Sequence, residues 1–293
     1  MRFMNNILKK LNDFNELVMF KHSIFSLPFI FIAMVVASLQ TNGSAWFGFK
    51  LLFLGILAAI TARNFAMGFN RYMDRDIDAL NPRTENRPNV DGRVSPKAML
   101  VFNIANVLGF IAVAYFVNDL AFYLSVPILI IIGSYSYFKR FSYLAHVILG
   151  VSLALAPIAG VVAVSETITL WSVLLSIGVM FWVAGFDLLY SLQDIDVDKK
   201  LGLHSIPSKF GPRSTMLISR TFHTLTVIFW LLFAISSNSG LFTYLAVLTG
   251  AIMLSYEHYL VNKDFTKIDK AFFTVNGYLG IVFFFLVLID AVV

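Results

Sequence analysis

The chain has 293 residues, of which 58% are hydrophobic and 13% are charged, and its mean hydropathy is +0.79. Because a soluble domain carries about 25% charged residues, this composition excludes an ordinary soluble enzyme and predicts an integral membrane protein. Cysteine is absent, which excludes disulfides, thiolate nucleophiles and cysteine metal sites. The formal net charge is +5, but the basic residues gather in particular loops between apolar segments, so we expect no nucleic-acid partner.

Residues 1–20 are predicted to form a helix that lies on the membrane surface. Charged residues interrupt this segment, so it lacks the compact apolar core and small-residue cleavage site of a signal peptide. A frayed polar tail is the alternative interpretation. The apolar residues that recur at helical spacing are Phe3, Ile7, Leu8, Leu11, Phe14 and Val18.

The rest of the chain contains about nine apolar segments, each near the roughly 20 residues that a membrane-spanning helix needs. The predicted fold is therefore an all-α integral membrane protein, and residues 1–293 are expected to form a single transmembrane domain. The predicted spans are residues 22–40, 46–70, 97–117, 119–138, 142–163, 168–191, 215–236, 239–258 and 271–290.

Lysine and arginine are distributed unequally among the connections between these spans. The connections after the first, third, fifth and seventh spans contain neither residue. Because basic loops stay on the cytoplasmic side, the N-terminus is predicted to be cytoplasmic and the C-terminus to lie outside a bacterial-type inner membrane. Nearly all basic residues lie in the N-terminal segment and in residues 71–97, 139–140, 192–213 and 259–270.

The first polar motif begins inside the second apolar segment. Asn70, Asp74 and Asp78 are four residues apart, so on a helix their side chains share one face. Arg63 lies seven residues before Asn70, close to the same face and about two turns deeper in the predicted span.

A second motif repeats this spacing with Tyr190, Asp194 and Asp198. Its aspartates follow those of the first motif by 120 positions (194 − 74 and 198 − 78), which hints at an internal duplication. Both motifs lie where a span ends on the predicted cytoplasmic side, and two unpaired acidic clusters facing each other would repel. A hard cation such as Mg²⁺, which takes oxygen ligands and phosphate, would resolve this repulsion. The predicted catalytic and metal-binding residues are Asn70, Asp74, Asp78, Asp194 and Asp198.

Basic side chains surround both motifs. Carboxylates for Mg²⁺ beside arginine and lysine side chains are typical of a diphosphate site, so residues 71–97 and 192–213 are predicted to be catalytic cytoplasmic loops. For Arg93, Lys97, Lys199 and Lys200 we favour a different role, as topological charges paired with nearby acids. The predicted substrate-binding basic residues are Arg71, Arg83, Arg87, Lys139 and Lys209.

Arg63 and Asp187 are charged residues that lie well inside predicted spans. Placing Arg63 there costs ~2.5–3.5 kcal/mol or more, so it should face a cavity and meet an anion. Asp187 lies about two helical turns before Asp194. A structural ion pair between Arg63 and Asp187 is the alternative to a role in substrate binding.

Aromatic and histidine residues give weaker signals. Tyr135 lies near the end of a span, where tyrosines mark the membrane interface or could line a carbocation pocket. Among the histidines, His22 beside Lys21 is the one candidate for function. The other four, expected to be interfacial, are His146, His204, His223 and His258.

Together these residues resemble the UbiA superfamily of intramembrane aromatic prenyltransferases over essentially the whole chain. The resemblance implies helices around a central cavity with a polar cap on the cytoplasmic side. It also implies substrate-binding roles for Asp187 and Tyr190 and, at the entry to the first span, for Lys21 and His22, whereas His204 departs from the lysine that relatives often have. The matching motifs are Asn70-xxx-Asp74-xxx-Asp78, Arg83-Thr84-xx-Arg87-Pro88, and Asp187-xx-Tyr190-xxx-Asp194-xxx-Asp198 followed by Gly202-xx-Ser205 and Phe210-Gly211.

The stretches 21–29, 81–84 and 137–141 are similar to the branch of 4-hydroxybenzoate polyprenyltransferase-like proteins, part of which is thought to prenylate a dihydroxynaphthoate. The resemblance implies Mg²⁺-dependent transfer from a polyprenyl diphosphate to an aromatic carboxylate acceptor in ubiquinone or menaquinone biosynthesis. The alternatives are prenyl transfer to a haem or lipid acceptor and, from another class, a cation-coupled transporter, whose acidic residues would lie near the membrane midplane.

Overall fold

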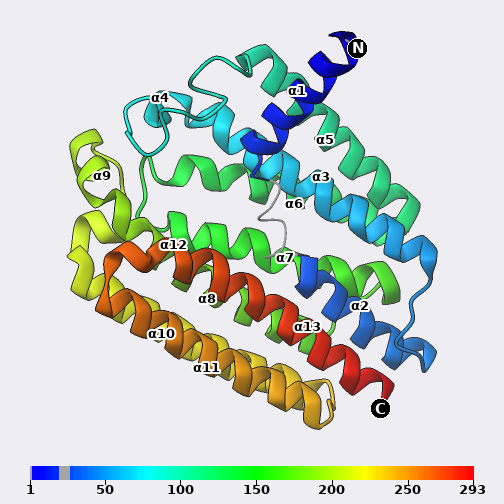
Figure 1. Ribbon diagram of the computed structural model, residues 1–293. Helices are drawn as coiled ribbons and strands as arrows, with labels where there is room; N and C mark the ends of the chain where they lie inside the picture. The colour runs from blue at the N-terminus through cyan, green and yellow to red at the C-terminus, as the bar shows by residue number, and fades with distance from the viewer. Residues whose placement is uncertain (1, 20–26) are drawn as a thin grey trace.

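The computed structural model describes residues 2–19 and 27–293, and this part of the chain contains helices and no strands. Long helices lie side by side and are joined by short connections (Figure 1). They are α1 (Arg2–Leu17), α2 (Leu27–Asn42), α3 (Phe49–Met73), α5 (Pro96–Val117), α6 (Asp119–Phe138), α7 (Ala145–Ser165), α8 (Leu170–Tyr190), α10 (Ile206–Ser236), α11 (Leu241–Lys263) and α13 (Asn276–Val292).

Short helical segments connect the long ones at one end of the bundle. They are α4 (Arg75–Asp78), the 3₁₀ turns η2 (Ser191–Asp194) and η3 (Phe265–Lys267), α9 (Ile195–Leu201), α12 (Ile268–Lys270) and the π-helical turn η4 (Ala271–Val275). The predicted loops 71–97 and 192–213 are therefore partly helical, because α3 continues to Met73 and α10 begins at Ile206. Within α10, Gly211 has φ 77° and ψ 172°, so the helix is kinked there, four residues before the predicted span begins at residue 215.

Each of the nine predicted spans overlaps one long helix, from α2 to α13. In the described part of the chain, seven segments are long and apolar enough to cross a membrane. The helix α2, with 16 residues, is shorter, and α11 is not among the seven. The prediction of a helical membrane protein is confirmed, whereas the count of nine crossings stays a prediction.

Side-chain caps define several helix starts. At α8 and α10, the Thr169–Ser172 and Ser205–Ser208 pairs satisfy each other's backbone N–H groups as capping boxes. At α6, the Asn118 side chain accepts a hydrogen bond from the amide of Ala121. These polar residues mark the starts of helices that hydropathy alone locates only to within a few residues.

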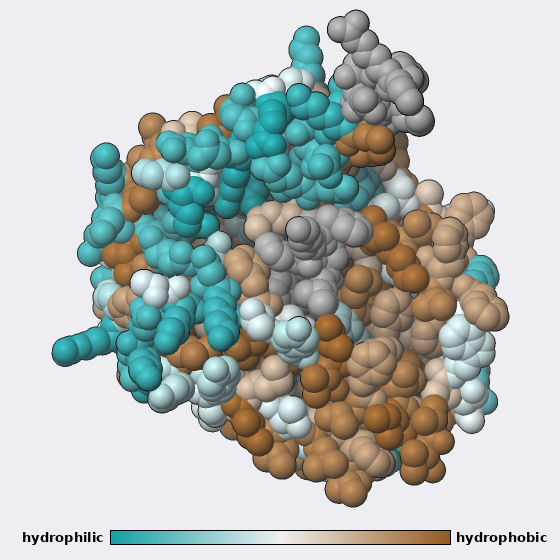
Figure 2. Space-filling model, viewed as in Figure 1, coloured by the Kyte–Doolittle hydropathy of each residue, from teal (hydrophilic) through white to brown (hydrophobic). Residues whose placement is uncertain are grey.

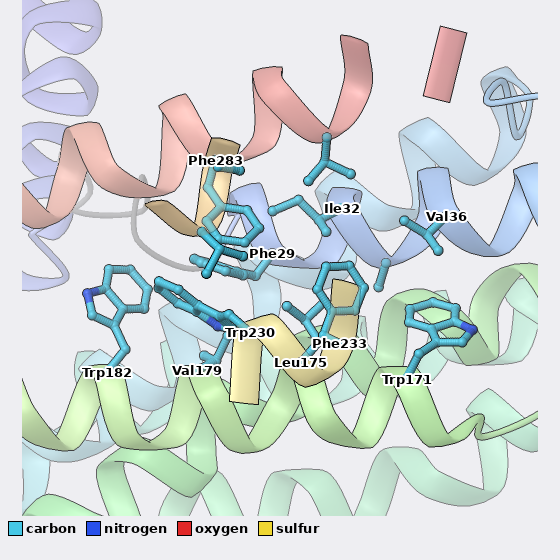
Figure 3. Close-up of a cluster of buried hydrophobic side chains, with 14 of the residues drawn as sticks. Phe29, Ile32, Val36, Trp171, Leu175, Val179, Trp182, Trp230, Phe233 and Phe283 are labelled. Atoms are coloured by element: carbon cyan, nitrogen blue, oxygen red, sulfur yellow. The ribbon is translucent and has the colours of Figure 1, made fainter. Parts of the chain in front are cut away.

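The apolar core lies where α2, α8, α10 and α13 meet (Figure 3). Phe29, Trp182 and Trp230 are all fully buried there. The rings of Phe29 and Trp230 stack at 5.6 Å, and Trp230 meets Phe283 edge-on at 4.8 Å. A Cβ on Gly178 would meet the Trp230 ring, so this glycine lets α8 and α10 approach closely.

A polar network lies inside the helices beside this core. The amide of Asn276 donates to Glu257 at 2.8 Å and accepts a hydrogen bond from the Trp182 indole at 2.7 Å. His223 and His258 are hydrogen-bonded to each other at 3.0 Å and are 3% and 9% exposed. The expectation that these two histidines are interfacial was wrong, because both are buried and their hydrogen bond joins α10 to α11 in the interior.

Hydrophilic side chains gather at the end of the molecule where α4 and α9 lie (Figure 2). The first helix, α1, packs near this end: Leu17 lies in a buried cluster with Val94 and Met99. Arg93 is bound to α1 through an ion pair with Glu16, whose Oε1 lies 2.8 Å from Arg93 Nη2. A second ion pair joins Arg93 to Asp91 in its own loop. For Arg93, the interpretation as a charge paired with nearby acids is therefore confirmed. Whether α1 lies on a membrane surface stays a prediction.

Candidate active site

A cavity of about 420 Å³ lies among α3, α6, α7 and α8 and extends to the end that carries α4 and α9. Its deeper wall is apolar, with side chains such as Ala62, Phe110 and Leu153. Both acidic motifs reach this one cavity, although they are far apart in the sequence. The predicted site residues in its wall are Arg63, Asn70, Arg71, Asp74, Asp78, Arg83, Arg87, Tyr135, Lys139, Asp187, Tyr190, Asp194 and Asp198.

Three predicted substrate-binding residues are not placed in this wall. Lys209 is exposed, and its ammonium group lies 4.1 Å from the centre of the Tyr143 ring and 5.1 Å from that of Phe210. Lys21 and His22 lie outside the described residues.

The first acidic motif is built on the junction of α3 and α4. Asp74 leaves the helical conformation (φ −95°, ψ 7°) and separates the two helices. Its Oδ2 accepts a hydrogen bond from the Asn70 amide at 2.7 Å and pairs with Lys139 Nζ at 2.6 Å. Asp78 pairs with Arg87 at 2.7 Å and accepts from Asn89 at 2.9 Å. Both carboxylates of this motif therefore lie beside basic groups from other segments of the chain.

The second motif is built on the junction of α8, η2 and α9. Asp194 has φ −103° and ψ 5°, nearly the conformation of Asp74. Arg83 binds both oxygens of Asp194, with Nε at 3.0 Å from Oδ1 and Nη2 at 2.6 Å from Oδ2, and donates to the Tyr190 hydroxyl at 2.9 Å. The loop that follows the first motif is therefore bound directly to the second.

These ion pairs change the expectation from the sequence that two unpaired acidic clusters would repel each other. The acidic clusters are not unpaired, because lysine and arginine partners balance Asp74, Asp78 and Asp194. Burial raises the pKa of Asp74, against the opposing attraction of Lys139. In the loop, the hydrogen bonds from Arg140 lower the pKa of Asp76.

The oxygen atoms at the polar end of the cavity could bind a hard cation, but they do not form a complete coordination shell. Asp74 Oδ1 is buried without a hydrogen-bond partner, and such an oxygen is a suitable ligand for Mg²⁺. Within the described residues, no three His, Asp or Glu side chains are grouped closely enough to hold a metal on their own. Any Mg²⁺ held here would therefore need ligands from a substrate as well, as is usual for that ion.

Arg63 and Asp187 do not form the ion pair that the sequence left open. Arg63 Nη2 donates to the Met19 carbonyl at 3.3 Å, and its Nε is buried without a hydrogen-bond partner. Asp187 instead pairs with His146 at 2.7 Å. His146 is buried and lies in the cavity wall, so placing it at the membrane interface was wrong. Only helix packing reveals this pair, since the two residues are 41 positions apart.

The fold and this acid-lined cavity define a helical membrane protein with a polar site at one end of the bundle. A family model described as the UbiA prenyltransferase family matches residues 26–289. The chain belongs to this family. The family assignment confirms the resemblance read from the two motifs and favours an enzyme over the transporter alternative.

The curated relatives include proteins named 4-hydroxybenzoate octaprenyltransferase. The protein from Serratia proteamaculans (strain 568) is 28% identical over 236 residues, which cover 80% of this chain and 81% of the relative. The protein from Herminiimonas arsenicoxydans is 29% identical over 244 residues, which cover 82% and 84%.

Solved structures of UbiA homologues share the fold. The apo structure of a homologue from Aeropyrum pernix K1 has a TM-score of 0.82 and 29% identity, and the match covers 92% of this chain and 98% of the other. A homologue from Archaeoglobus fulgidus, described as bound to DMAPP and Mg²⁺, has a TM-score of 0.69 and 19% identity, with 92% and 99% covered. At that identity the second likeness shows the fold alone.

Proposed function

We propose that this protein transfers a polyprenyl group from a polyprenyl diphosphate to an aromatic carboxylic acid, 4-hydroxybenzoate or a dihydroxynaphthoate, in ubiquinone or menaquinone biosynthesis. The observation that carries the proposal is the single cavity that joins both acidic motifs to an apolar interior. Its polar end suits a diphosphate, and its apolar wall suits a prenyl chain. The names of the curated relatives support the acceptor class.

The diphosphate would bind at the polar end, where Arg83 and Lys139 are paired with aspartates. Asn70, Asp74, Asp78, Asp194 and Asp198 would hold Mg²⁺ together with the phosphate oxygens, and the ion would stabilise the negative charge of the leaving diphosphate. As the phosphate arrives, Arg83 and Lys139 can exchange their aspartates for phosphate oxygens. Their side chains, with those of Arg71 and Arg87, would stabilise charge on the leaving group.

Breaking the allylic C–O bond leaves a carbocation, which the electron-rich ring of the acceptor attacks. Tyr135 and Tyr190 lie in the cavity wall, where their π-faces can stabilise positive charge. We infer that Arg63 binds the carboxylate of the acceptor, because it lies in the wall without an acidic partner among the described residues. Lys21 and His22 are second candidates for this role, on the family resemblance.

The donor and acceptor can be tested with purified protein, Mg²⁺ and prenyl diphosphates of several lengths. A panel of acceptors should include 4-hydroxybenzoate, a dihydroxynaphthoate and analogues without the carboxylate, with products identified by mass spectrometry. We expect a prenylated aromatic acid. A product formed only with a haem or lipid acceptor, or no product from any member of the panel, would overturn the proposal.

The role of Arg63 can be tested in the same assay. Arg63→Ala should lose about 2–4 kcal/mol of transition-state stabilisation with the carboxylate acceptor and little more with an analogue that lacks the carboxylate. Arg220→Ala is the matched control, since Arg220 is an exposed arginine on α10 outside the cavity wall. The assignment would be contradicted if the losses from Arg63→Ala and from removal of the acceptor carboxylate were additive. A defect confined to use of the prenyl donor would also contradict it.

The proposed orientation places the N-terminus in the cytoplasm and the C-terminus outside, with the catalytic residues on the cytoplasmic side. The alternation of basic loops supports it. A topology reporter fused after Val293 should be active outside the inner membrane, and a cytoplasmic signal would mean that the number of crossings is even.

A further inference from the structure

A histidine–aspartate pair lies in the cavity wall outside the two acidic motifs. His146 is at the start of α7, and Asp187 is near the end of α8. His146 Nδ1 lies 2.7 Å from Asp187 Oδ2, and His146 is 5% exposed. The second ring nitrogen, Nε2, is buried and has no hydrogen-bond partner in the described part of the chain.

The packing of α7 against α8 holds this pair in place. The connection between these helices is four residues long (166–169), so they run antiparallel, and the start of one faces the end of the other. Gly150 lies one turn after His146, and a Cβ there would meet the backbone carbonyl of Met180. The glycine allows the close approach of the two backbones that brings the imidazole to the carboxylate.

The pair has the chemistry of an oriented general base. An ionised Asp187 accepts the hydrogen on Nδ1, which leaves the lone pair on Nε2 free to take a proton. The same carboxylate then stabilises the imidazolium that forms. Three of the four predicted metal-binding aspartates are less suited to this task, because Asp74, Asp78 and Asp194 each have a basic partner.

We propose that His146 is the catalytic base that completes prenyl transfer, with Asp187 as its positioning residue; this rests on the proposed function. When the ring carbon bonds to the prenyl cation, that carbon still carries its hydrogen and the ring is positively charged. Nε2 of His146 takes this proton, and the electrons of the broken C–H bond restore the aromatic ring. The diphosphate has already left with the electron pair of the C–O bond.

The test compares turnover of an aromatic acceptor that carries hydrogen or deuterium at its reactive ring positions. In the wild-type protein we expect equal rates, because loss of diphosphate is slow and proton removal is fast. His146→Gln preserves polarity but removes the base, so kcat should fall by about 10²–10⁴-fold, and the deuterated acceptor should now react more slowly. The KM for the prenyl diphosphate should change little.

Asp187→Asn supplies a second variant that keeps the size of the side chain. It should lower kcat and show the same deuterium effect, because the amide neither fixes the correct tautomer nor stabilises the imidazolium. His204→Gln is the matched control: it replaces another histidine of the cavity wall and should show no deuterium effect, whatever its rate. Thermal unfolding in detergent checks that each variant is folded.

A folded His146→Gln variant with a wild-type rate and no deuterium effect would overturn the inference. So would a raised acceptor KM with equal rates for the two isotopes, which would make His146 a binding residue. Either outcome leaves the proposed function standing, since the wild-type protein still forms product. If the wild-type protein prenylates no aromatic acceptor, the proposed function itself fails.

Discussion

The two acidic motifs share a sequence spacing and a local backbone, yet the protein buries them to different depths. Asp74 lies between α3 and α4, and Asp194 ends the 3₁₀ turn η2 just before α9; their φ and ψ values agree within about ten degrees. The side chain of Asp74 is 3% exposed, whereas that of Asp194 is 19% exposed. The repeated sequence therefore repeats the turn, and the surrounding helices decide the environment.

The partners of the two motifs differ in the same way. Lys139, at the end of α6, pairs with Asp74, so the first motif is held within the bundle. Asp194 is held by Arg83 and Asn81 from the loop that follows the first motif. This loop links the two motifs, and the second motif depends on it for its charge balance. Two motifs with the same spacing can thus be held by different parts of the protein within one site.

The largest expected effect falls on both motifs equally. Asp74→Ala and Asp194→Ala should each reduce turnover by on the order of 10²–10³-fold or more, because each removes a group that stabilises the leaving diphosphate. Asp76→Ala is the matched control, since Asp76 lies between Asp74 and Asp78 but is exposed and pairs with Arg140 outside the cavity. Turnover with each variant, beside its thermal unfolding, checks this. Near-normal turnover of either cavity variant would rule out a site that needs both clusters.

A smaller effect should appear as a difference between the motifs in how much an alanine substitution lowers the free energy of unfolding. Asp78→Ala removes hydrogen bonds from Arg87 and Asn89 to a buried carboxylate, so it should lower the free energy of unfolding by about 1.5–3 kcal/mol. Asp198→Ala should cost less, because Asp198 is partly exposed and forms no ion pair in the described structure. Denaturant unfolding of both variants in detergent measures the difference. Equal decreases in the free energy of unfolding would mean that Asp78 and Asp198 contribute equally to stability.

The smallest effect concerns the ion pairs of Arg93, in the loop that follows the first motif. Arg93 binds Glu16 of α1 and Asp91 in the loop after the first motif. These groups are near the surface, so Arg93→Ala should lower the free energy of unfolding by about 0–1 kcal/mol, less at high salt, and leave turnover unchanged. Unfolding at low and high salt checks the first part. A large loss of activity would show that α1 positions the catalytic loop.

The family and the composition of the site could be predicted from the sequence. Hydropathy located the long helices, and for α6 the predicted limits of 119 and 138 are those of the helix. The spacing of four residues marked Asn70, Asp74 and Asp78 as one face, and these residues do line the cavity. Such patterns are local: helix periodicity and apolar length are set by residues a few positions apart.

Contacts between distant residues were decided by the tertiary structure. Arg83 and Asp194 are 111 positions apart, and His146 and Asp187 are 41 apart. The sequence marked Arg83 and Asp187 as charged residues of interest but did not show their partners, and it placed His146, His223 and His258 at the interface. A histidine has the same local pattern at an interface, in a core or in a cavity wall. The packing of the helices decides which of these three environments a histidine occupies, and that packing depends on the whole bundle.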